Sequence, residues 1–435
     1  MSTPLIATTL LVVANLISFQ SCWAESATLF SPIRKDESSN LYSMLIYMKT
    51  PLQASQLHLD LGSFLPWYDC SRHYKSSSYA PVIYNSSLCI DLHTNVYGNC
   101  FDKPRPGCAN DTCFDFPQNP VTLKGGMGSI ITDKFTLPSI NTNTNTSPLQ
   151  IVLSCTFPNK YSKIYRGLAK GSAGLASLGR FNYSLSALIA RGSNSPWIFA
   201  LCLPNSSNST GIALFNSAGP YNFSPRIDVS KLLSYTPLIL AAKGAETDTM
   251  YWYKSPEYYV GLYSFRVGGK VVNLNQTLLA LDDLGRGGAK ISSSRPYSVL
   301  QSSIYKALVD AFVKESASLN LTTSAPVGPF SVCFEADKVP TTSVGPVVPA
   351  IDLVFPRSKN FWRIHGSNSM VRMKNAWCLG FVDGGGEPRT SVVIGGHQIE
   401  DNLLQFDLER ERLGFSSSLL LKSTTCASFD FKSNY

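Results

Sequence analysis

Two similar strand-to-loop turns carry the residues of this sequence that could do acid–base chemistry. An apolar strand enters the Asp-Leu-Gly-Ser sequence that begins at Asp60, and a later strand enters three serines that begin at Ser292. Two facing carboxyl groups at such turns can share one proton, so that one activates water while the other protonates a carbonyl. Ser292 offers only a hydroxyl, which can donate a hydrogen bond but cannot titrate near neutral or acidic pH. We therefore expect Asp60 to be a buried acid that is held by Ser292 or by backbone amides.

The other catalytic patterns that we considered are missing from the sequence. Its five histidines form no H-E-x-x-H arrangement, and there is no G-x-S-x-G elbow and no phosphate-binding loop. A Ser-His-Asp triad assembled from distant segments stays open, although no motif indicates one. Cys100, Cys108 and Cys113 could be zinc ligands, but they lack a C-x-x-C pair, which favours disulfides instead. We predict no metal site and no cofactor.

The elements that must position these turns are short β-strands. Apolar runs broken by Gly, Pro, Asn and Ser predict strands at 41–48, 56–61, 134–137, 151–155, 197–203, 258–267 and 391–394. One helix is indicated, with Ile304, Leu308 and Phe312 on its buried face and a cap at Ser302 or Ser303. Each turn is followed by a later apolar strand that ends in glycine, at 173–179 and at 392–396. This weak repeat predicts an all-β protein of two similar lobes with a cleft between them.

Composition limits the class of protein further. The chain has 435 residues, of which 44% are hydrophobic and 15% charged, with a formal net charge of +8. That apolar share is enough to fill a large core, so disorder throughout is excluded. Lys and Arg are not clustered as in a nucleic-acid-binding protein. The mild positive charge suggests weak attraction to acidic polymers, such as a wall polysaccharide.

The N-terminus and the cysteines indicate a secreted glycoprotein. Residues 1–24 read as a signal peptide, because a short apolar run precedes small residues at a cleavage site, and no later segment is apolar enough to span a membrane. Ten cysteines then remain, an even number that permits five disulfides: Cys70, Cys89, Cys100, Cys108, Cys113, Cys155, Cys202, Cys333, Cys378 and Cys426. Sequons for N-glycosylation begin at Asn85, Asn110, Asn145, Asn182, Asn205, Asn208, Asn222, Asn275 and Asn320.

The order of these motifs along the chain, with the sequence Arg-Leu-Gly-Phe-Ser from Arg412, resembles the pepsin-like aspartic proteases. The resemblance implies a bilobal all-β fold with a few short helices, and we place the lobes at 25–230 and 231–435. It also implies that Asp60 and Ser292 stand at the two positions of a degenerate catalytic dyad. The stretch that matches the family's flap, residues 119–133, contains no Tyr. With dyad and flap both altered, we expect no efficient peptide hydrolysis.

Within that group the chain resembles a plant set, namely extracellular dermal glycoproteins, basic 7S globulins and the xylanase and xyloglucanase inhibitors. The motifs that carry this resemblance are 64–70, 104–113, 219–223, 366–371, 380–385, 395–402 and 424–426. The resemblance implies a secreted protein of the plant cell wall that has no protease activity and whose partner is a secreted glycoside hydrolase. A rigid loop with a basic side chain could enter the hydrolase cleft and bind its paired carboxylates.

Two departures from the plant set keep other functions open. Inhibitory relatives place Arg on two loops where this chain has Ser343 and Ser423, although Lys422 lies beside the second. A storage-like or peptide-binding protein, or an atypical protease that uses Asp60 alone, are the alternatives. Relatives also carry twelve cysteines, and the two missing ones fall at Tyr84 and Tyr97, which suggests that one whole disulfide has been lost.

Overall fold

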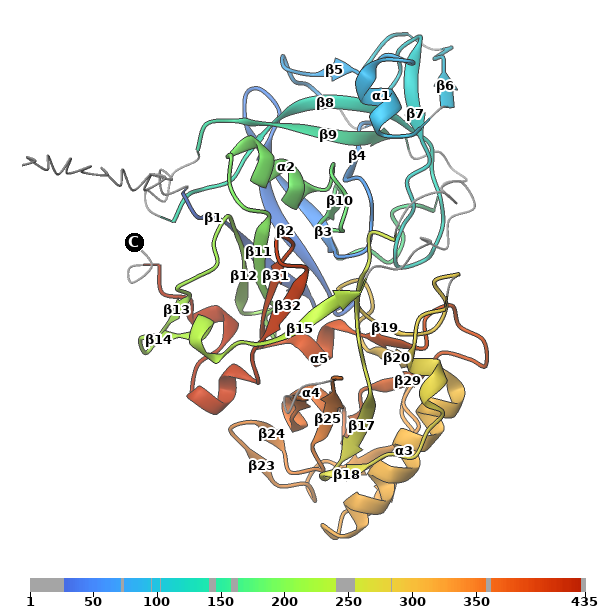
Figure 1. Cartoon of the computed structure of the whole chain (residues 1–435), viewed down its shortest axis with the longest axis vertical. Coiled ribbons are helices and arrows are strands. Elements are labelled where there is room, and N and C mark those ends of the chain that lie inside the picture. The colour runs from blue at the N-terminus through green and yellow to red at the C-terminus, as the bar shows by residue number, and fades with distance from the viewer. Residues whose placement is uncertain are drawn as a thin grey trace, which may run out of the picture.

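The structure is a computed structural model that describes residues 27–71, 74–94, 96–101, 103–140, 146–157, 163–239, 255–282, 284–356 and 361–431. Its strands build two lobes, and strands from both halves of the chain meet where the lobes join (Figure 1). The predicted all-β, bilobal architecture is therefore confirmed. The predicted signal peptide and Asn145 lie outside the described residues, and the lobe boundaries at 25–230 and 231–435 stay a prediction.

The described residues of the first half of the chain form the following strands. They are β1 (Leu29–Asp36), β2 (Leu41–Met48), β3 (Gln53–Asp60), β4 (Trp67–Asp69), β5 (Ala80–Pro81), β6 (Val96–Gly98), β7 (Thr112–Asp115), β8 (Gly128–Thr136), β9 (Leu149–Thr156), β10 (Gly174–Ser177), β11 (Ile198–Cys202), β12 (Thr210–Phe215), β13 (Asn222–Phe223) and β14 (Ile227–Asp228). Strand β2 has the bounds that its apolar run predicts.

The second half adds shorter strands. They are β15 (Ser234–Ile239), β16 (Tyr258–Val260), β17 (Ser264–Val267), β18 (Lys270–Val271), β19 (Ala289–Ile291), β20 (Ser298–Leu300), β21 (Thr323–Ser324), β22 (Cys333–Glu335), β23 (Thr341–Thr342), β24 (Gly345–Pro346), β25 (Ile351–Val354), β26 (Phe361–Ile364), β27 (Met370–Met373), β28 (Ala376–Leu379), β29 (Phe381–Asp383), β30 (Val392–Ile394), β31 (Leu403–Asp407) and β32 (Arg412–Phe415). The predicted single strand at 258–267 is wrong, because β16 pairs with β15 and β19 whereas β17 joins β25 in another sheet.

Helices are few and mostly short. They are α1 (Ser87–Asp91), α2 (Leu185–Gly192), α3 (Ser302–Ala317), α4 (Gly366–Ser369) and α5 (Gly396–Ile399), with 3-10 turns η1 (Val229–Leu232), η2 (Gln276–Leu279), η3 (Leu419–Lys422) and η4 (Cys426–Ser428). Helix α3 confirms the predicted helix, and Ile304, Leu308 and Phe312 are buried as expected. The predicted serine cap is wrong. The side chain of Gln301 caps the helix by accepting hydrogen bonds from the amides of Ser303 and Ile304.

The internal repeat appears in the structure as two parallel strand pairs. In the first half β3 pairs with β10, and Asp60 lies opposite Ser177 at the end of β3. In the second half β19 pairs with β30, and Ser292 follows directly after β19. Both turns therefore leave the carboxyl end of a strand that has a parallel neighbour, which places the two turns in equivalent positions.

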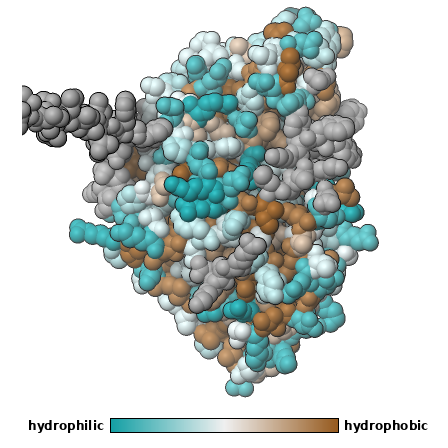
Figure 2. Space-filling model, in the orientation of Figure 1, coloured by the Kyte–Doolittle hydropathy of each residue, from teal (hydrophilic) through white to brown (hydrophobic). Residues whose placement is uncertain are grey.

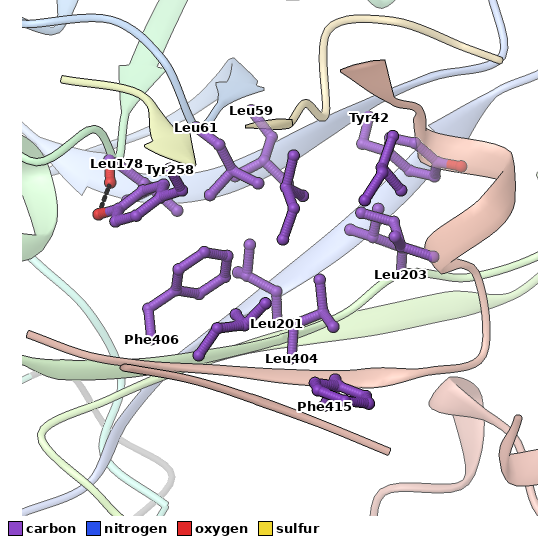
Figure 3. Close-up of a cluster of buried hydrophobic side chains, with 14 of the residues drawn as sticks. Tyr42, Leu59, Leu61, Leu178, Leu201, Leu203, Tyr258, Leu404, Phe406 and Phe415 are labelled. Carbon is purple, nitrogen blue, oxygen red and sulfur yellow. Dashed lines mark hydrogen bonds between the residues drawn. The ribbon is translucent and has the colours of Figure 1, made fainter. Parts of the chain in front are cut away.

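A hydrophobic cluster that spans both halves fixes these turns relative to each other. Strand β11 pairs with β31 in antiparallel register, and Phe199 stacks on Phe406 with their ring centroids 4.7 Å apart. Tyr258 packs against Phe406 and donates a hydrogen bond of 2.7 Å to the carbonyl of Leu178 (Figure 3). Leu59 and Leu61, which flank Asp60, are buried in this cluster. Burial of these apolar surfaces therefore holds Asp60 in place.

The ten cysteines form five disulfides, as their even number predicts. The pairs are Cys70–Cys155, Cys89–Cys113, Cys100–Cys108, Cys202–Cys426 and Cys333–Cys378. Tyr84 and Tyr97 make an edge-to-face contact with ring centroids 5.3 Å apart. The two tyrosines at the missing cysteine positions are therefore neighbours, which supports the interpretation that one whole disulfide has been replaced.

Candidate functional site

Asp60 is the centre of the candidate site, and both oxygens of its carboxylate accept hydrogen bonds. Its side chain lies at the end of β3, where only 2% of the residue is exposed. Oδ2 accepts hydrogen bonds from the amide of Gly62 at 3.0 Å and from the hydroxyl of Ser63 at 2.6 Å. Oδ1 accepts from the hydroxyl of Ser294 at 2.5 Å. The expected buried acid held by a backbone amide is present.

The serine that reaches Asp60 is Ser294, so the expected bond from Ser292 is wrong. The hydroxyl of Ser292 accepts from the amide of Ser294 at 3.2 Å, and its own amide donates to Ile394. Ser293 donates its hydroxyl to the carbonyl of Leu59, across the junction between the halves. The turn after β19 thus uses its first serine within the turn and its next two to contact β3. The sequence indicates three serine hydroxyls in this turn, but it does not indicate which of them contacts Asp60 on β3.

His58 is a buried member of the site that the sequence motifs did not indicate. Its Nδ1 accepts from the amide of Ala169 at 3.3 Å, and its Nε2 lies 3.0 Å from the hydroxyl of Ser294. Burial lowers the pKa of His58 to about 4, although the nearby charge of Asp60 opposes this. The neutral ring therefore carries its proton on Nε2 and donates it to Ser294, which donates in turn to Asp60. The only sequence signal was that His58 lies two residues before Asp60, on the same face of the strand.

This chain of hydrogen bonds is not a Ser-His-Asp catalytic triad. In such a triad histidine lies between serine and aspartate, accepts the serine proton and is oriented by the carboxylate. Here Ser294 lies in the middle, and its proton points to Asp60 rather than to His58. All three side chains are at most 2% exposed. The arrangement stabilises a buried carboxylate and does not place a histidine to accept the proton of a serine.

A cavity of about 480 Å³ is lined by Asp60 and by two further acids, Glu257 and Asp383. Hydrogen bonds from the hydroxyl of Ser302 and the amide of Gly385 lower the pKa of Asp383, so it too favours the ionised form. A Cβ added at Gly62 would lie 3.3 Å from Cγ of Glu257 and 3.8 Å from Oδ2 of Asp60, so both acids border this glycine. Glu257 forms an ion pair with Lys290 and accepts hydrogen bonds from Tyr259 and Ser255. No hydrogen bond joins it to Asp60 within the described ranges.

Glu257 does not restore a proton-sharing pair. Burial raises the pKa of Glu257, but the Lys290 ammonium and the hydroxyls of Tyr259 and Ser255 outweigh burial and hold it below its usual value. A shared-proton mechanism needs one carboxyl group to remain protonated at working pH. Glu257 instead stays ionised and neutralised by Lys290. Glu257 therefore does not supply the protonated acid that such a mechanism needs beside Asp60.

The segment at 118–125 lies beside the cavity and is tied to both halves of the molecule. The amide of the Asn119 side chain donates to the carbonyls of Ile164 and Arg166. Arg295, which follows the three serines, donates from Nη1 to the carbonyl of Val121 at 3.1 Å. A hydrogen bond from Arg295, in the second half of the chain, therefore holds the segment that matches the flap at the edge of the cavity.

The loop residues singled out for inhibition lie on the surface. Ser343 is exposed in the turn between β23 and β24. Lys422 is the last residue of η3 and Ser423 follows it with a positive φ of 53°, and both are exposed. The structure places none of these three residues in the cavity beside Asp60 and Ser292, so the two candidate sites are separate.

The sequons are mostly exposed. Asn85, Asn110, Asn182, Asn205, Asn208, Asn275 and Asn320 have exposed side chains. Asn222 is half-buried in β13, and Asn145 lies outside the described residues. Oδ1 of Asn275 caps η2.

The described ranges hold no group of three or more His, Cys, Asp or Glu side chains arranged to bind a metal ion. Within the same ranges, no helix has both the length and the apolar character that a membrane span requires.

Comparison with known proteins gives a consistent family. The domain family described as "Xylanase inhibitor N-terminal" matches residues 42–217, and "Xylanase inhibitor C-terminal" matches residues 257–417. The crystal structure titled "Crystal structure of edgp" superposes with a TM-score of 0.88 at 42% identity, covering 93% of this chain and 98% of that chain.

Two curated plant relatives differ in what their names claim. "Probable aspartic proteinase GIP1" of Glycine max is 43% identical over 92% of this chain and 91% of the relative. "Gamma conglutin 1" of Prunus dulcis is 37% identical over 92% of this chain and 88% of the relative. Taken with the bilobal β fold, these matches show that the chain belongs to the xylanase-inhibitor family of aspartic-protease-like proteins, the plant set that its motifs indicate.

Proposed function

We propose that this protein is a secreted, catalytically inactive homologue of the aspartic proteases that binds and inhibits cell-wall-degrading glycoside hydrolases of microbes, acting in plant defence. The observation that supports catalytic inactivity is the environment of Asp60. Its carboxylate is occupied by Ser294, Ser63 and the amide of Gly62, with Ser292 at the equivalent turn. Without a second carboxyl group that can share a proton with Asp60, the shared-proton mechanism cannot operate.

The second part, inhibition, rests on the family and on charge. The partner that fits is a xyloglucanase or xylanase, because such enzymes display paired carboxylates that a basic side chain on a rigid loop can bind. The matches to xylanase-inhibitor domains and the net charge of +8 support this partner. Five disulfides support secretion into an oxidising compartment, which for a plant protein is the cell wall space. N-glycans on the exposed sequons belong to the same proposal.

A second candidate function has its own support. The resemblance to inhibitory relatives implies arginine at the positions that Ser343 and Ser423 occupy in this chain. Some similar proteins are named conglutins or globulins. A storage-like protein, or one that binds a peptide ligand, fits these observations without any enzyme target.

The deciding experiment is titration of the purified protein against a panel of xyloglucanases and xylanases at two salt concentrations. Nanomolar inhibition that weakens with salt supports the proposed function, because exposed charge pairs are screened by salt. No inhibition across the panel supports the storage or peptide-binding alternative. Pepstatin-sensitive cleavage of denatured haemoglobin at acid pH, abolished by Asp60→Asn, would contradict the inactive assignment and revive an atypical protease.

A further inference from the structure

The hairpin that connects β7 to β8 is fastened to the segment 163–170 by one buried side chain, that of Asn119. The backbone amide of Asn119 donates to the carbonyl of Lys124 at 2.9 Å, near the tip of the hairpin. Its side-chain amide donates to the carbonyl of Arg166 at 2.8 Å. A backbone that is fixed in this way loses little further conformational freedom when it binds a partner, which favours affinity.

Three exposed cations lie on these two segments, and we call them the cationic rim: Lys124, Lys163 and Arg166. The amide of Arg166 donates to the carbonyl of Lys163 at 3.0 Å, which closes a turn and sets their Cα atoms about 7 Å apart or less. The two hydrogen bonds through Asn119 keep the Cα atoms of Lys124 and Arg166 within about 16 Å of each other. The three charges are therefore close enough to act on one bound molecule.

No carboxylate of the described residues neutralises the cationic rim. Within the described ranges, no ion pair or hydrogen bond involves any of its three side chains. The stretches 116–127 and 163–170 contain no Asp or Glu. Glu257 and Asp383, which line the neighbouring cavity, accept hydrogen bonds from other side chains. The positive charge of the rim is thus available to an anion from outside, which it attracts.

Apolar side chains are exposed beside these cations. Phe116 and Met127 lie opposite each other in the register that β7 and β8 set, and both are exposed. Leu123, next to Lys124, is also exposed. On the face that Figure 2 shows, hydrophobic side chains are interspersed with hydrophilic ones. The hairpin therefore combines cations with small apolar surfaces, and it lacks the continuous apolar face with which a segment lies in a membrane.

We propose that the cationic rim binds an acidic polysaccharide, a polymer of uronic-acid sugars such as a plant wall contains. Each sugar of such a polymer carries a carboxylate, which Lys or Arg binds through charge-assisted hydrogen bonds. The C–H groups of the sugar ring can pack on the exposed side chains of Leu123 and Met127. Because the carboxylates repeat along the polymer, one chain can contact all three cations, and the contacts reinforce one another.

This inference goes beyond the proposed function, of which it needs only the secreted location. Binding to a wall polymer retains the protein in the wall, whether or not the protein inhibits a hydrolase. Lack of inhibition across the hydrolase panel would therefore leave polysaccharide binding intact, and lack of polysaccharide binding would leave inhibition intact.

The test uses the full-length secreted protein and polygalacturonate as the probe. We expect binding that weakens as salt is added, because exposed charge pairs are screened. Fully methyl-esterified polygalacturonate has the same backbone without the charges, and it should not bind. Equal binding to both polymers, or no binding to either, would overturn the proposal. Tighter binding to vesicles of anionic lipid than to polygalacturonate would also overturn it.

A pair of double variants locates the binding surface. Lys124→Gln/Arg166→Gln removes two charges of the rim and should raise the Kd for polygalacturonate about tenfold or more. Lys134→Gln/Lys314→Gln, the matched control, removes two exposed cations of β8 and α3 and lowers the net charge equally. The control should change the Kd less than about threefold.

Equal weakening by both double variants would show that net charge, and not the cationic rim, attracts the polymer. Lys124→Arg retains the charge and should retain binding, whereas its failure to bind would contradict the assigned role of that charge. Equal urea midpoints for all variants exclude unfolding as the cause of lost binding, because the altered side chains are exposed.

Discussion

At the scale of single residues, Ser294 and Ser292 differ in what their hydroxyls stabilise. The hydroxyl of Ser294 bridges His58 and Asp60 in a buried position, whereas the hydroxyl of Ser292 accepts a hydrogen bond within its own turn. Ser294→Ala leaves both a carboxylate oxygen and a ring N–H without partners, so we expect the free energy of unfolding to fall by about 2–4 kcal/mol. Ser292→Ala should lower it by less than about 1 kcal/mol. Urea unfolding of both variants measures this, and equal losses would contradict the assigned contacts.

The same buried chain predicts a pH dependence of stability. Burial lowers the pKa of His58 from 6.5 to about 4 in the folded protein. Between these values the unfolded chain binds more protons at this site, so the histidine's contribution to stability is complete above about pH 6.5 and is lost as the pH falls toward 4. Asp115 and Asp401 act in the opposite direction, because burial raises the pKa of each to about 6.

The variant His58→Gln isolates this effect, because it retains Asp115 and Asp401. We expect the unaltered protein to lose about 3 kcal/mol more stability than His58→Gln between pH 6.5 and pH 4. Urea unfolding at a series of pH values gives the slope of the free energy of unfolding against pH for each of the two proteins. Parallel slopes would show that His58 is not held neutral by burial.

Residues of this site could be predicted from the sequence only where the signal is local. Asp60 ends an apolar run and lies two residues before a glycine, so its place at the end of β3 can be predicted from the sequence. The partner of its carboxylate is not, because Ser294 lies 234 residues away and three adjacent serines look alike in sequence. Which hydroxyl faces Asp60 depends on how the turn after β19 packs against β3, a contact between segments far apart in the sequence.

At the scale of elements, a helix or strand could be predicted where its own sequence has a helical spacing of apolar residues or an unbroken apolar run. The four-residue spacing of Ile304, Leu308 and Phe312 identified α3, yet its cap at Gln301 was missed, because glutamine is not among the preferred cap residues. The run at 258–267 was read as one strand because nothing local marks a change of sheet. The partners of β16 and β17 lie far away in the sequence and separate them.

The contact between Tyr84 and Tyr97 gives an element-scale prediction for the segment of α1, β6 and β7. Their rings meet at the two positions where the resemblance to the plant set implies a further pair of cysteines. The double variant Tyr84→Cys/Tyr97→Cys should form a sixth disulfide and stabilise the protein by about 3 kcal/mol, the value for a closed loop of about 15 residues. Mass mapping should find no free thiol, and the melting temperature should rise.

The single variants provide the control for that prediction. Tyr84→Cys alone loses the ring contact and leaves one free thiol, so it should be less stable than the double variant. Two free thiols in the double variant would show that the backbone has moved away from disulfide geometry at this site.

At the scale of the whole molecule, the hydrophobic cluster around Phe406 is shared by the two lobes. The cluster includes Leu59 from the first half and Phe406 from the second, and β11 continues the sheet into β31. The turns that carry Asp60 and Ser294 are placed by this shared core. Any loss of packing there should therefore disturb both lobes and the chain of hydrogen bonds between them.

Phe406→Ala tests this coupling. Phe406 is fully buried between Phe199 and Tyr258, so its truncation should cost about 3–5 kcal/mol. Because the core is shared, tryptophan fluorescence and far-ultraviolet circular dichroism should report the same transition at a lower urea concentration. Phe101→Ala, at a side chain that is 99% exposed, should leave the midpoint unchanged. Two separate transitions in Phe406→Ala would mean that each lobe can stand alone, and that contacts other than the shared core hold Ser294 against Asp60.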